Sequence, residues 1–325
     1  MSKLKKKILI IISSVLLTVG VTFLVINLIP LNKIPSTNPW ISLDKTLICA
    51  HRGGAKLNPE NTKKAFDYVI KETTYVDIIE IDVRTTKDGV LVINHDDTLN
   101  RMALDKNDSK VSIYENNYED LLKYNLGKNF KDLNDTSPYA SLDILEAKEA
   151  GLLLMSFVDF LDEYKFVRDF KLFLEIKDSG QKAIEAVDKV HNLFEKDEYL
   201  WWRNRTMIIS FDNNVINYTL DNYPSFYVGA LGSIIDEEIV LNNLSLDSLS
   251  TPRFHCLQTQ TSRYIAGIKY NLATKEFIEM LHLRNQAVTY WTINDENEMN
   301  HLVDIGADII TTDRPDLLES VINKS

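Results

Sequence analysis

Two histidines and two carboxylates in the first third of the chain have the residue types of a catalytic site. His51, Glu80, Asp82 and His95 each lie at or near the end of an apolar segment of strand-like length. An imidazole gains or loses a proton near neutral pH, so one histidine can accept a proton while the other donates one. Carboxylate oxygens bind hard divalent cations. If the fold brings these side chains together, they are equipped for metal-assisted phosphoryl chemistry with acid–base catalysis.

The two carboxylates are spaced as members of one metal site. Glu80 and Asp82 are two residues apart in a predicted strand, so their side chains point to the same face. Two carboxylates this close repel each other, which raises the pKa of one of the two carboxyl groups unless a cation lies between them. Oxygen ligands of this kind suit Ca²⁺ or Mg²⁺. The alternative is a pair of surface acids on an edge strand, and the neighbouring isoleucines argue against it.

Two basic residues can bind the phosphate of a substrate. Arg52 directly follows His51, and its planar guanidinium can hold a phosphodiester oxygen. Lys177 can add a second positive charge. Lys177 lies two residues after Glu175 and shares its face of the strand, so it can instead form an internal salt bridge with Glu175. Lys177 can bind phosphate and form this salt bridge at the same time.

Three further residues each have two interpretations. Glu60 follows Pro59 at a predicted helix start, where its carboxylate either interacts with the helix dipole or contacts the site. Trp291 lies near the end of a predicted strand and either packs on the substrate or closes the top of the fold. Asp313 ends the last predicted strand, where we expect a turn role, with the orientation of a site residue as the alternative.

A short connection after the second strand predicts a hairpin. Only six residues, Arg84 to Gly89, separate that strand from the next apolar segment, 90–94. A parallel crossover needs ten or more residues, whereas Asp88-Gly89 is a tight-turn signal. The segment should therefore fold back antiparallel and bring His95 towards Asp82. Residues 96–150 lack regular alternation, and we expect them to form an insertion without a separate core.

Elsewhere strand-like and helix-like segments alternate along the chain. Such alternation implies a parallel sheet, and eight repeats imply a TIM barrel, with an open doubly wound sheet as the alternative. The spacing G-x-G-x-x-G of a dinucleotide site is absent. In a TIM barrel the active site lies at the C-terminal ends of the strands. The strands are predicted at 47–50, 76–83, 172–176, 207–211, 226–231, 255–259, 288–293 and 309–312.

The N-terminal region is typical of a membrane anchor. Residues 8–29 carry no charge and would span about 33 Å as a helix, enough for the hydrocarbon core. The basic segment 1–7 places the N-terminus in the cytoplasm and the remainder outside. A cleaved signal peptide is the alternative, but the apolar run is long and no small-residue cleavage site follows it. We expect a stalk over 30–45 and the barrel over 46–325.

The charge and cysteine content narrow the function classes. The net charge of −11 becomes about −16 when the five lysines of residues 1–33 are set aside. A domain this acidic is unsuited to nucleic-acid binding, because proteins bind nucleic acid through lysine and arginine side chains that neutralise its phosphates. Cys49 and Cys256 both lie in strand-like segments, where we expect buried thiols, and nothing in the spacing requires a disulfide.

Several motifs in a fixed order resemble the glycerophosphodiester phosphodiesterase family. The similarity covers roughly residues 46–318, most of the chain. The motifs are HRGG (51–54), PENT (59–62), EIDVRTTKDG (80–89), VINHDDTLNR (92–101), LEIK (174–177), ISF (209–211), WTIN (291–294) and ITTD (310–313).

The resemblance implies roles for several of these residues. Glu80, Asp82 and Glu175 match the positions that hold one divalent cation, and both histidines match catalytic positions. The implied reaction releases glycerol phosphate and an alcohol from a small-molecule or lipid-headgroup diester. The chain departs from the family pattern at Met102-Ala103 and at 153–155, which leaves open the shape of the insertion and the identity of the alcohol.

Two other functions remain open at this point. A phospholipase D-like activity on lysolipids or sphingolipids would use the same two histidines and acidic metal site. A non-catalytic binding protein could keep the barrel without turnover, although a pure binder has no need of two titrating histidines. The sequence does not determine which histidine is the acid and which is the base. We expect His51 to accept a proton and His95 to donate one to the leaving alcohol, with the reverse assignment left open. The predicted location is the cell membrane, with the catalytic domain outside.

Overall fold

Eight parallel strands close into a barrel within the part of the chain that the structure describes. This computed structural model describes residues 3–35 and 37–324. Residues 1–2 of the predicted basic segment, residue 36 of the predicted stalk and residue 325 of the predicted barrel lie outside the described residues. Strand β1 pairs with both β2 and β11, which closes the sheet and confirms the predicted TIM barrel. In order around the barrel, the strands are β1 (Leu47–Ala50), β2 (Ile78–Thr85), β4 (Lys171–Ile176), β5 (Thr206–Ile209), β6 (Tyr227–Ala230), β7 (Cys256–Thr259), β10 (Ala287–Tyr290) and β11 (Ile309–Thr312).

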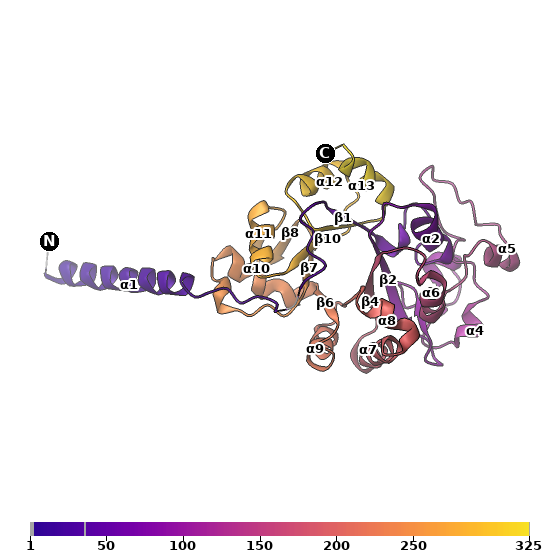
Figure 1. Cartoon of the computed structure of the whole chain (residues 1–325), viewed down its shortest axis with the longest axis horizontal. Helices are drawn as coiled ribbons and strands as arrows, with labels where there is room; N and C mark the ends of the chain where they lie inside the picture. Colours follow the sequence, from indigo (N-terminus) through magenta and orange to yellow (C-terminus); the bar gives the residue numbers. More distant parts are fainter. Residues whose placement is uncertain (1–2, 36, 325) are drawn as a thin grey trace.

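Helices surround the barrel, and α1 projects from its side (Figure 1). The helices around the barrel are α2 (Lys63–Asp67), α6 (Phe157–Tyr164), α7 (Gly180–Phe194), α8 (Leu200–Arg203), α9 (Asn213–Asn222), α10 (Asp236–Asn243), α11 (Lys275–Leu283), α12 (Glu296–Asp304) and α13 (Pro315–Ile322). Short helical turns are η1 (His51–Gly53), η2 (Tyr68–Glu72), η3 (Asp197–Tyr199), η4 (Gly232–Ile235) and η5 (Asp247–Leu249).

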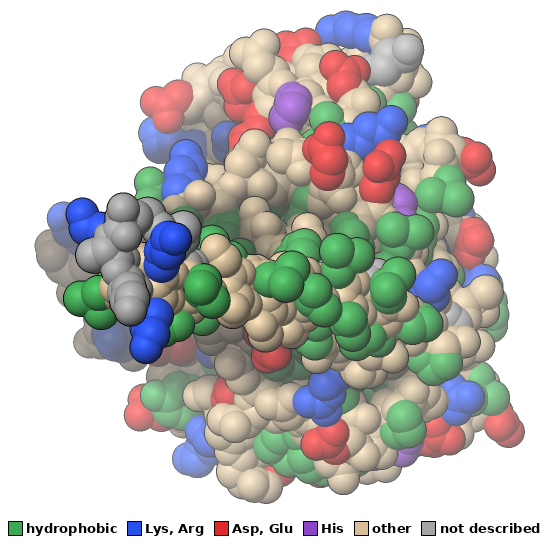
Figure 2. Space-filling model, turned by 90° about the vertical axis from the view of Figure 1, so that its left-hand side faces the viewer, with side chains coloured by type: hydrophobic (Ala, Val, Ile, Leu, Met, Phe, Trp, Pro, Cys, Tyr) green, Lys and Arg blue, Asp and Glu red, His purple; other side chains and the backbone are tan. Residues whose placement is uncertain are grey.

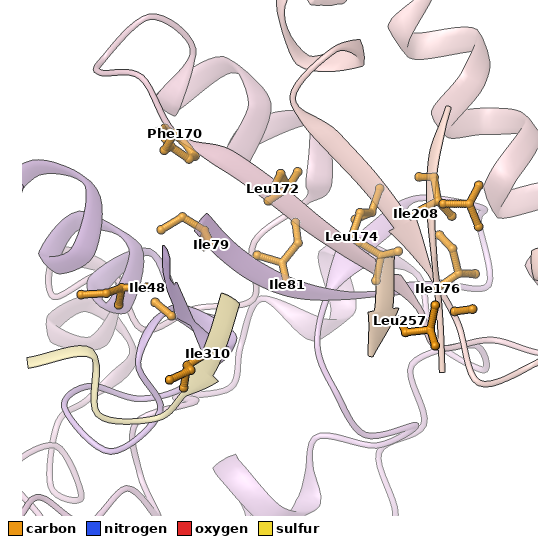
Figure 3. Packing of buried hydrophobic residues seen from close by; sticks show 14 of the residues in the cluster. Ile48, Ile79, Ile81, Phe170, Leu172, Leu174, Ile176, Ile208, Leu257 and Ile310 are labelled. Atoms are coloured by element: carbon orange, nitrogen blue, oxygen red, sulfur yellow. The ribbon is translucent and has the colours of Figure 1, made fainter. Parts of the chain in front are cut away.

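Alternate residues of each strand belong to two separate apolar layers. Side chains such as Ile79 and Leu172 point outward and pack in the layer beneath the helices (Figure 3). Their neighbours Ile78 and Phe173 point inward and fill the barrel. This period of two follows from strand geometry, and it fixes which residues face the interior at the top of each strand.

The predicted hairpin arm is present. Strand β3 (Leu91–Ile93) pairs antiparallel with β2, and the turn places Gly89 at φ +83°, a conformation that favours glycine. The Asn94 N–H donates to the carbonyl of Asp82 at 2.9 Å. This bond brings the following residue, His95, close enough to Asp82 to lower the pKa of that carboxyl, in the direction that the sequence predicted.

The insertion after the arm packs in a small apolar cluster that it shares with Val92 of the hairpin arm and with Leu154. Its helices are α3 (Asn100–Ala103), α4 (Tyr118–Leu121) and α5 (Ile144–Glu149). Apolar residues spaced irregularly in sequence meet there, which is why no periodic pattern revealed them. They include Leu99, Met102, Ile113, Leu121 and Leu126. A second hairpin, β8 (Ser262–Ile265) with β9 (Ile268–Asn271), was also not predicted.

The predicted stalk is partly packed against the barrel. Trp40 is fully buried, and its ring lies 5.2 Å from that of Phe173 in the lowest layer of the barrel interior. Asn38 donates through Nδ2 to the carbonyl oxygens of His255, at 2.6 Å, and Asn285, at 2.9 Å. The barrel therefore includes these residues, because its N-terminal end needs an apolar side chain to close it.

Helix α1 (Lys3–Asn27) is long and apolar enough to span a membrane over Leu4–Ile26. Its apolar side chains are exposed along its length, with lysines near the free end (Figure 2). Where it meets the barrel, Ser248 Oγ donates to the carbonyl oxygen of Ile26 at 2.9 Å. The two cysteines are both buried free thiols, as predicted.

Candidate active site

The predicted site residues converge at the C-terminal end of the barrel. They surround a cavity of about 170 Å³. Asp82 lies beneath this cavity, and Glu60 lies behind Arg52. The predicted residues that line the cavity are His51, Arg52, Glu80, His95, Glu175, Lys177 and Trp291.

Three carboxylates form the floor of the site. Oxygen atoms of Glu80, Asp82 and Glu175 lie within 4.8 Å of one another, and all three side chains are buried. The first two follow each other on one face of β2, and Glu175 is the register partner of Asp82 on β4. Adjacent parallel strands therefore place the third carboxylate beside the pair that the sequence already showed.

The charges on this floor fit a divalent cation. Burial, with the charge of Asp82 beside it, raises the pKa of Glu80 to about 8, and the same two causes raise the pKa of Glu175. Burial would also raise the pKa of Asp82, but Arg52 and Lys177 lower it overall. None of the described residues gives a hydrogen bond to Glu80 Oε1 or Asp82 Oδ1. Buried carboxylates that repel one another and keep unbonded oxygens are the donor set that Ca²⁺ or Mg²⁺ requires.

Two cations lie at the edge of the acidic floor. Lys177 Nζ is 2.8 Å from Glu175 Oε1 and 3.7 Å from Asp82 Oδ1, so the internal salt bridge considered from the sequence is formed. Arg52 Nε is 3.2 Å from Asp82 Oδ2. Because both also line the cavity, the salt bridges hold their positive charge beside any group that enters it.

The HRGG sequence forms a turn that folds back onto the floor. Arg52, Gly53 and Gly54 all have positive φ, at +53°, +78° and +87°. A Cβ added to Gly53 would lie 3.0 Å from the Cβ of Ala65, so this position also lacks room for a side chain. The turn allows the Arg52 N–H to donate to Glu80 Oε2 at 2.8 Å. The glycines are therefore needed to bring backbone and carboxylate together.

Each predicted catalytic histidine is paired with a carboxylate through Nδ1. His51 Nδ1 lies 2.6 Å from Asp313 Oδ1, and His95 Nδ1 lies 2.7 Å from Asp96 Oδ1. Such a pair holds the Nδ1 proton and leaves Nε2 for proton transfer. Burial disfavours the charged form of His51, but Asp313 and Glu80 outweigh it and raise its pKa. The turn role expected for Asp313 was wrong, because the closed barrel brings β11 next to β1.

Comparison with known proteins places this geometry in a family. The model of the glycerophosphoryl diester phosphodiesterase family matches residues 51–317. The chain belongs to this family. The predicted family and the predicted enzyme class, a phosphoric diester hydrolase, are thereby confirmed.

Relatives of this glycerophosphodiester phosphodiesterase family member cover most of its length. A glycerophosphodiester phosphodiesterase of Bacillus altitudinis is 27% identical over 272 residues, which cover 83% of this chain and 96% of the relative. A human lysophospholipase D is 25% identical over 285 residues, which cover 84% of this chain and 85% of the relative. The solved structure of an Oleispira antarctica phosphodiesterase in complex with sn-glycerol-3-phosphate is 19% identical, covers 86% of this chain and 97% of that one, and superposes with a TM-score of 0.62.

Glu60 does not begin a helix in this family member, so its helix-dipole interpretation was wrong. Helix α2 begins at Lys63, and the side chain of Thr62 caps it by accepting from the N–H of Ala65. Glu60 instead accepts from Arg52 Nη1 at 3.0 Å and from Arg101 Nη2 at 2.6 Å. The contact with the site that the sequence left open is therefore made through Arg52.

Sequence reasoning missed three polar residues that complete the site. Arg101 Nε donates to Asp96 Oδ2 at 2.7 Å and so connects Glu60 with the carboxylate behind His95. Asn61 Nδ2 donates to Asp82 Oδ2 at 2.8 Å. Asp96 and Arg101 both belong to the quoted VINHDDTLNR segment, but nothing in their spacing of five shows which partners they bind.

Trp291 directly follows β10 and lines the cavity. Its ring meets that of Phe211 edge to face at 5.6 Å between centroids. The indole Nε1 is buried, and within the described ranges it has no hydrogen-bond partner. The residue therefore presents an aromatic surface to the cavity.

Proposed function

We propose that the chain hydrolyses glycerophosphodiesters to glycerol phosphate and an alcohol with one bound divalent cation. The observation that carries the proposal is the convergence of three buried carboxylates, two basic residues and two carboxylate-paired histidines on one small cavity. Glu80, Asp82 and Glu175 would hold the cation, and Ca²⁺ or Mg²⁺ suits their oxygens. When bound, the cation would polarise the phosphoryl group and neutralise its developing charge.

The chain's own residues supply binding and proton transfer. Arg52 and Lys177 hold phosphate oxygens at the cavity edge, and Glu60 fixes Arg52 from behind. His51 Nε2 accepts a proton from the nucleophile, which is either water or a neighbouring hydroxyl of the substrate. In the latter case a cyclic phosphate forms first and is then hydrolysed. His95 Nε2 donates a proton to the departing alcohol, and Trp291 packs on the substrate.

Product analysis of glycerophosphocholine tests this reaction. The full-length protein in detergent with Mg²⁺ or Ca²⁺ should release glycerol phosphate and choline in equal amounts. Release of phosphocholine would contradict the proposed bond cleavage, and no release with either cation would contradict the assigned activity.

A phospholipase D-like activity on lysolipids is the second candidate. The human relative is named a lysophospholipase D, and the exposed ring of Phe211 gives the cavity mouth an apolar edge where an acyl chain can lie. The same assay with lysophosphatidylcholine would then release choline and lysophosphatidic acid. Faster turnover of the lysolipid than of glycerophosphocholine would favour this second function.

We also propose that α1 spans the cell membrane once, with the barrel outside. The lysines at its start favour a cytoplasmic N-terminus. The Ile34 N–H donates to the carbonyl of Arg284 at 3.0 Å, so few residues separate the span from the barrel. The catalytic domain would thus lie close to the bilayer.

A protease-protection experiment tests this topology. With a short tag at the N-terminus, the full-length protein should stay in membranes after an alkaline carbonate wash. Protease added outside intact cells should digest the barrel and leave the tag protected. A soluble product that begins near residue 30 would show instead that the segment is a cleaved signal peptide.

A further inference from the structure

The histidine of the hairpin arm lies beyond the end of its strand. Strand β3 ends at Ile93, which is paired with Val83 of β2. After the bond from the Asn94 N–H to the carbonyl of Asp82, the chain has no regular structure at His95. Proton transfer nevertheless requires this imidazole to lie within hydrogen-bond distance of the reacting group. The position of His95 therefore depends on side chains that hold it from outside the strand.

An arginine of β2 binds the backbone of this histidine. Arg84 Nε donates to the carbonyl oxygen of His95 at 2.8 Å. Arg84 lies two residues after Asp82, so the two residues share one face of the strand. Within the described part of the chain, Arg52 and Lys177 line the cavity and Arg84 does not. Arg84 therefore acts on the histidine and not on a group inside the cavity.

A carboxylate that follows the neighbouring strand fixes this arginine. Asp178 Oδ1 lies 3.4 Å from Arg84 Nη1, and Asp178 Oδ2 accepts from the N–H of Thr85 at 2.9 Å. The two side chains are only 16% and 9% exposed. Hydrogen bonds between charged groups are stronger than neutral ones, and the planar guanidinium gives them a defined direction. Through Arg84, the end of β4 that carries Glu175 is thus connected to His95.

We propose that Arg84 is a positioning residue for His95, and that Asp178 holds Arg84 in place. The inference rests on the proposed function, because it requires His95 to transfer a proton. Asp96 sets the orientation of the imidazole ring, whereas Arg84 sets the position of the backbone from which the ring extends. A displacement of about 1 Å in a catalytic group can lower the rate about 10²-fold. Loss of the bond from Arg84 should therefore slow the reaction without any change in the groups that line the cavity.

A double-mutant cycle with the full-length protein in detergent and Mg²⁺ or Ca²⁺ tests this role. Arg84→Met keeps a long side chain and removes its donors, so it should lower kcat for glycerophosphocholine about 10- to 100-fold and leave KM nearly unchanged. Because Arg84 acts through His95, the same substitution should cause no further loss in His95→Ala. Asp178→Asn, which keeps an acceptor for the Thr85 N–H, should show a smaller loss with the same dependence on His95. It provides the same cycle if Arg84→Met does not fold.

Another arginine provides the matched control. Arg168 also donates through Nε to a backbone carbonyl oxygen, that of Ile70 at 3.1 Å, but it precedes β4 at the N-terminal end of the strand. Arg168→Met should keep the wild-type kcat. An unchanged kcat in Arg84→Met, or an equally large further loss in His95→Ala, would overturn the inference, because a purely structural role lowers both backgrounds alike. Failure of the wild-type protein to cleave glycerophosphocholine would instead refute the proposed function, so the two failures are distinguishable.

Discussion

His51→Ala should lower kcat for glycerophosphocholine by about 10²- to 10⁴-fold, the usual contribution of a general base. The expected loss follows from the pairing of His51 with Asp313, which leaves Nε2 to accept a proton at the cavity. His95→Ala should cause a loss of similar size through its own pair with Asp96. Steady-state kinetics of the two variants with the same divalent cation present measures both effects.

The leaving group separates the roles of the two histidines. Choline is a poor leaving group that needs a proton, whereas 4-nitrophenol leaves without one. On the 4-nitrophenyl ester of glycerol phosphate, His95→Ala should therefore recover most of its activity, and His51→Ala should not. Recovery in His51→Ala alone would reverse the assignment. His191→Ala is the control, because that imidazole stacks on Tyr223 away from the cavity and should be dispensable.

Strand periodicity fixes the direction of those site side chains that could be predicted from the sequence. In β2 the series Ile78, Glu80 and Asp82 is inward-facing because alternate residues of a strand share a face. In β4 the same rule places Glu175 above Phe173. The apolar residue in each series marks the interior of the barrel, and the acids that follow it lie at the end where TIM barrels carry their sites.

The parts that sequence could not predict depend on long-range closure of the chain. Asp313 and His51 are 262 residues apart, and they meet only because β11 pairs with β1. Glu60 reaches Arg101 across 41 residues, because the insertion folds over the turn that follows β1. Neither pairing has a local pattern, so local rules assigned Asp313 to a turn and Glu60 to a helix start.

Removal of the divalent cation is expected to abolish activity and to destabilise the barrel. Chelation with EDTA should lower turnover of glycerophosphocholine by more than about 10²-fold, because metal ions supply several kcal/mol of charge stabilisation. Returning the cation at about 100 times its Kd should add about 2.7 kcal/mol to the free energy of unfolding, seen as a higher melting temperature. Glu80→Gln should lose both responses, since it removes a ligand charge from the floor.

A buried glutamate outside the site provides the control for this substitution. Glu238 is 8% exposed, like Glu175, and accepts a hydrogen bond from Gln286 Nε2 at 3.1 Å. Glu238→Gln should keep the activity and the cation-dependent rise in melting temperature. If Glu80→Gln also kept that rise, the acidic floor would not be the cation site.

Without a bound cation, Glu80→Gln should raise the stability of the protein, whereas with the cation it should lower it. Burial and Asp82 raise the pKa of Glu80 from 4.5 to about 8 in the folded chain, so its ionisation opposes folding. Stability of the metal-free wild-type protein should therefore fall as the pH rises from about 4.5 towards 8, and the variant should lose this part of the pH dependence. At pH 7 without a cation, Glu80→Gln should melt at a higher temperature than wild type, and with the cation at a lower one. A variant that is less stable under both conditions would contradict the view that repulsion among these carboxylates is relieved by the bound cation.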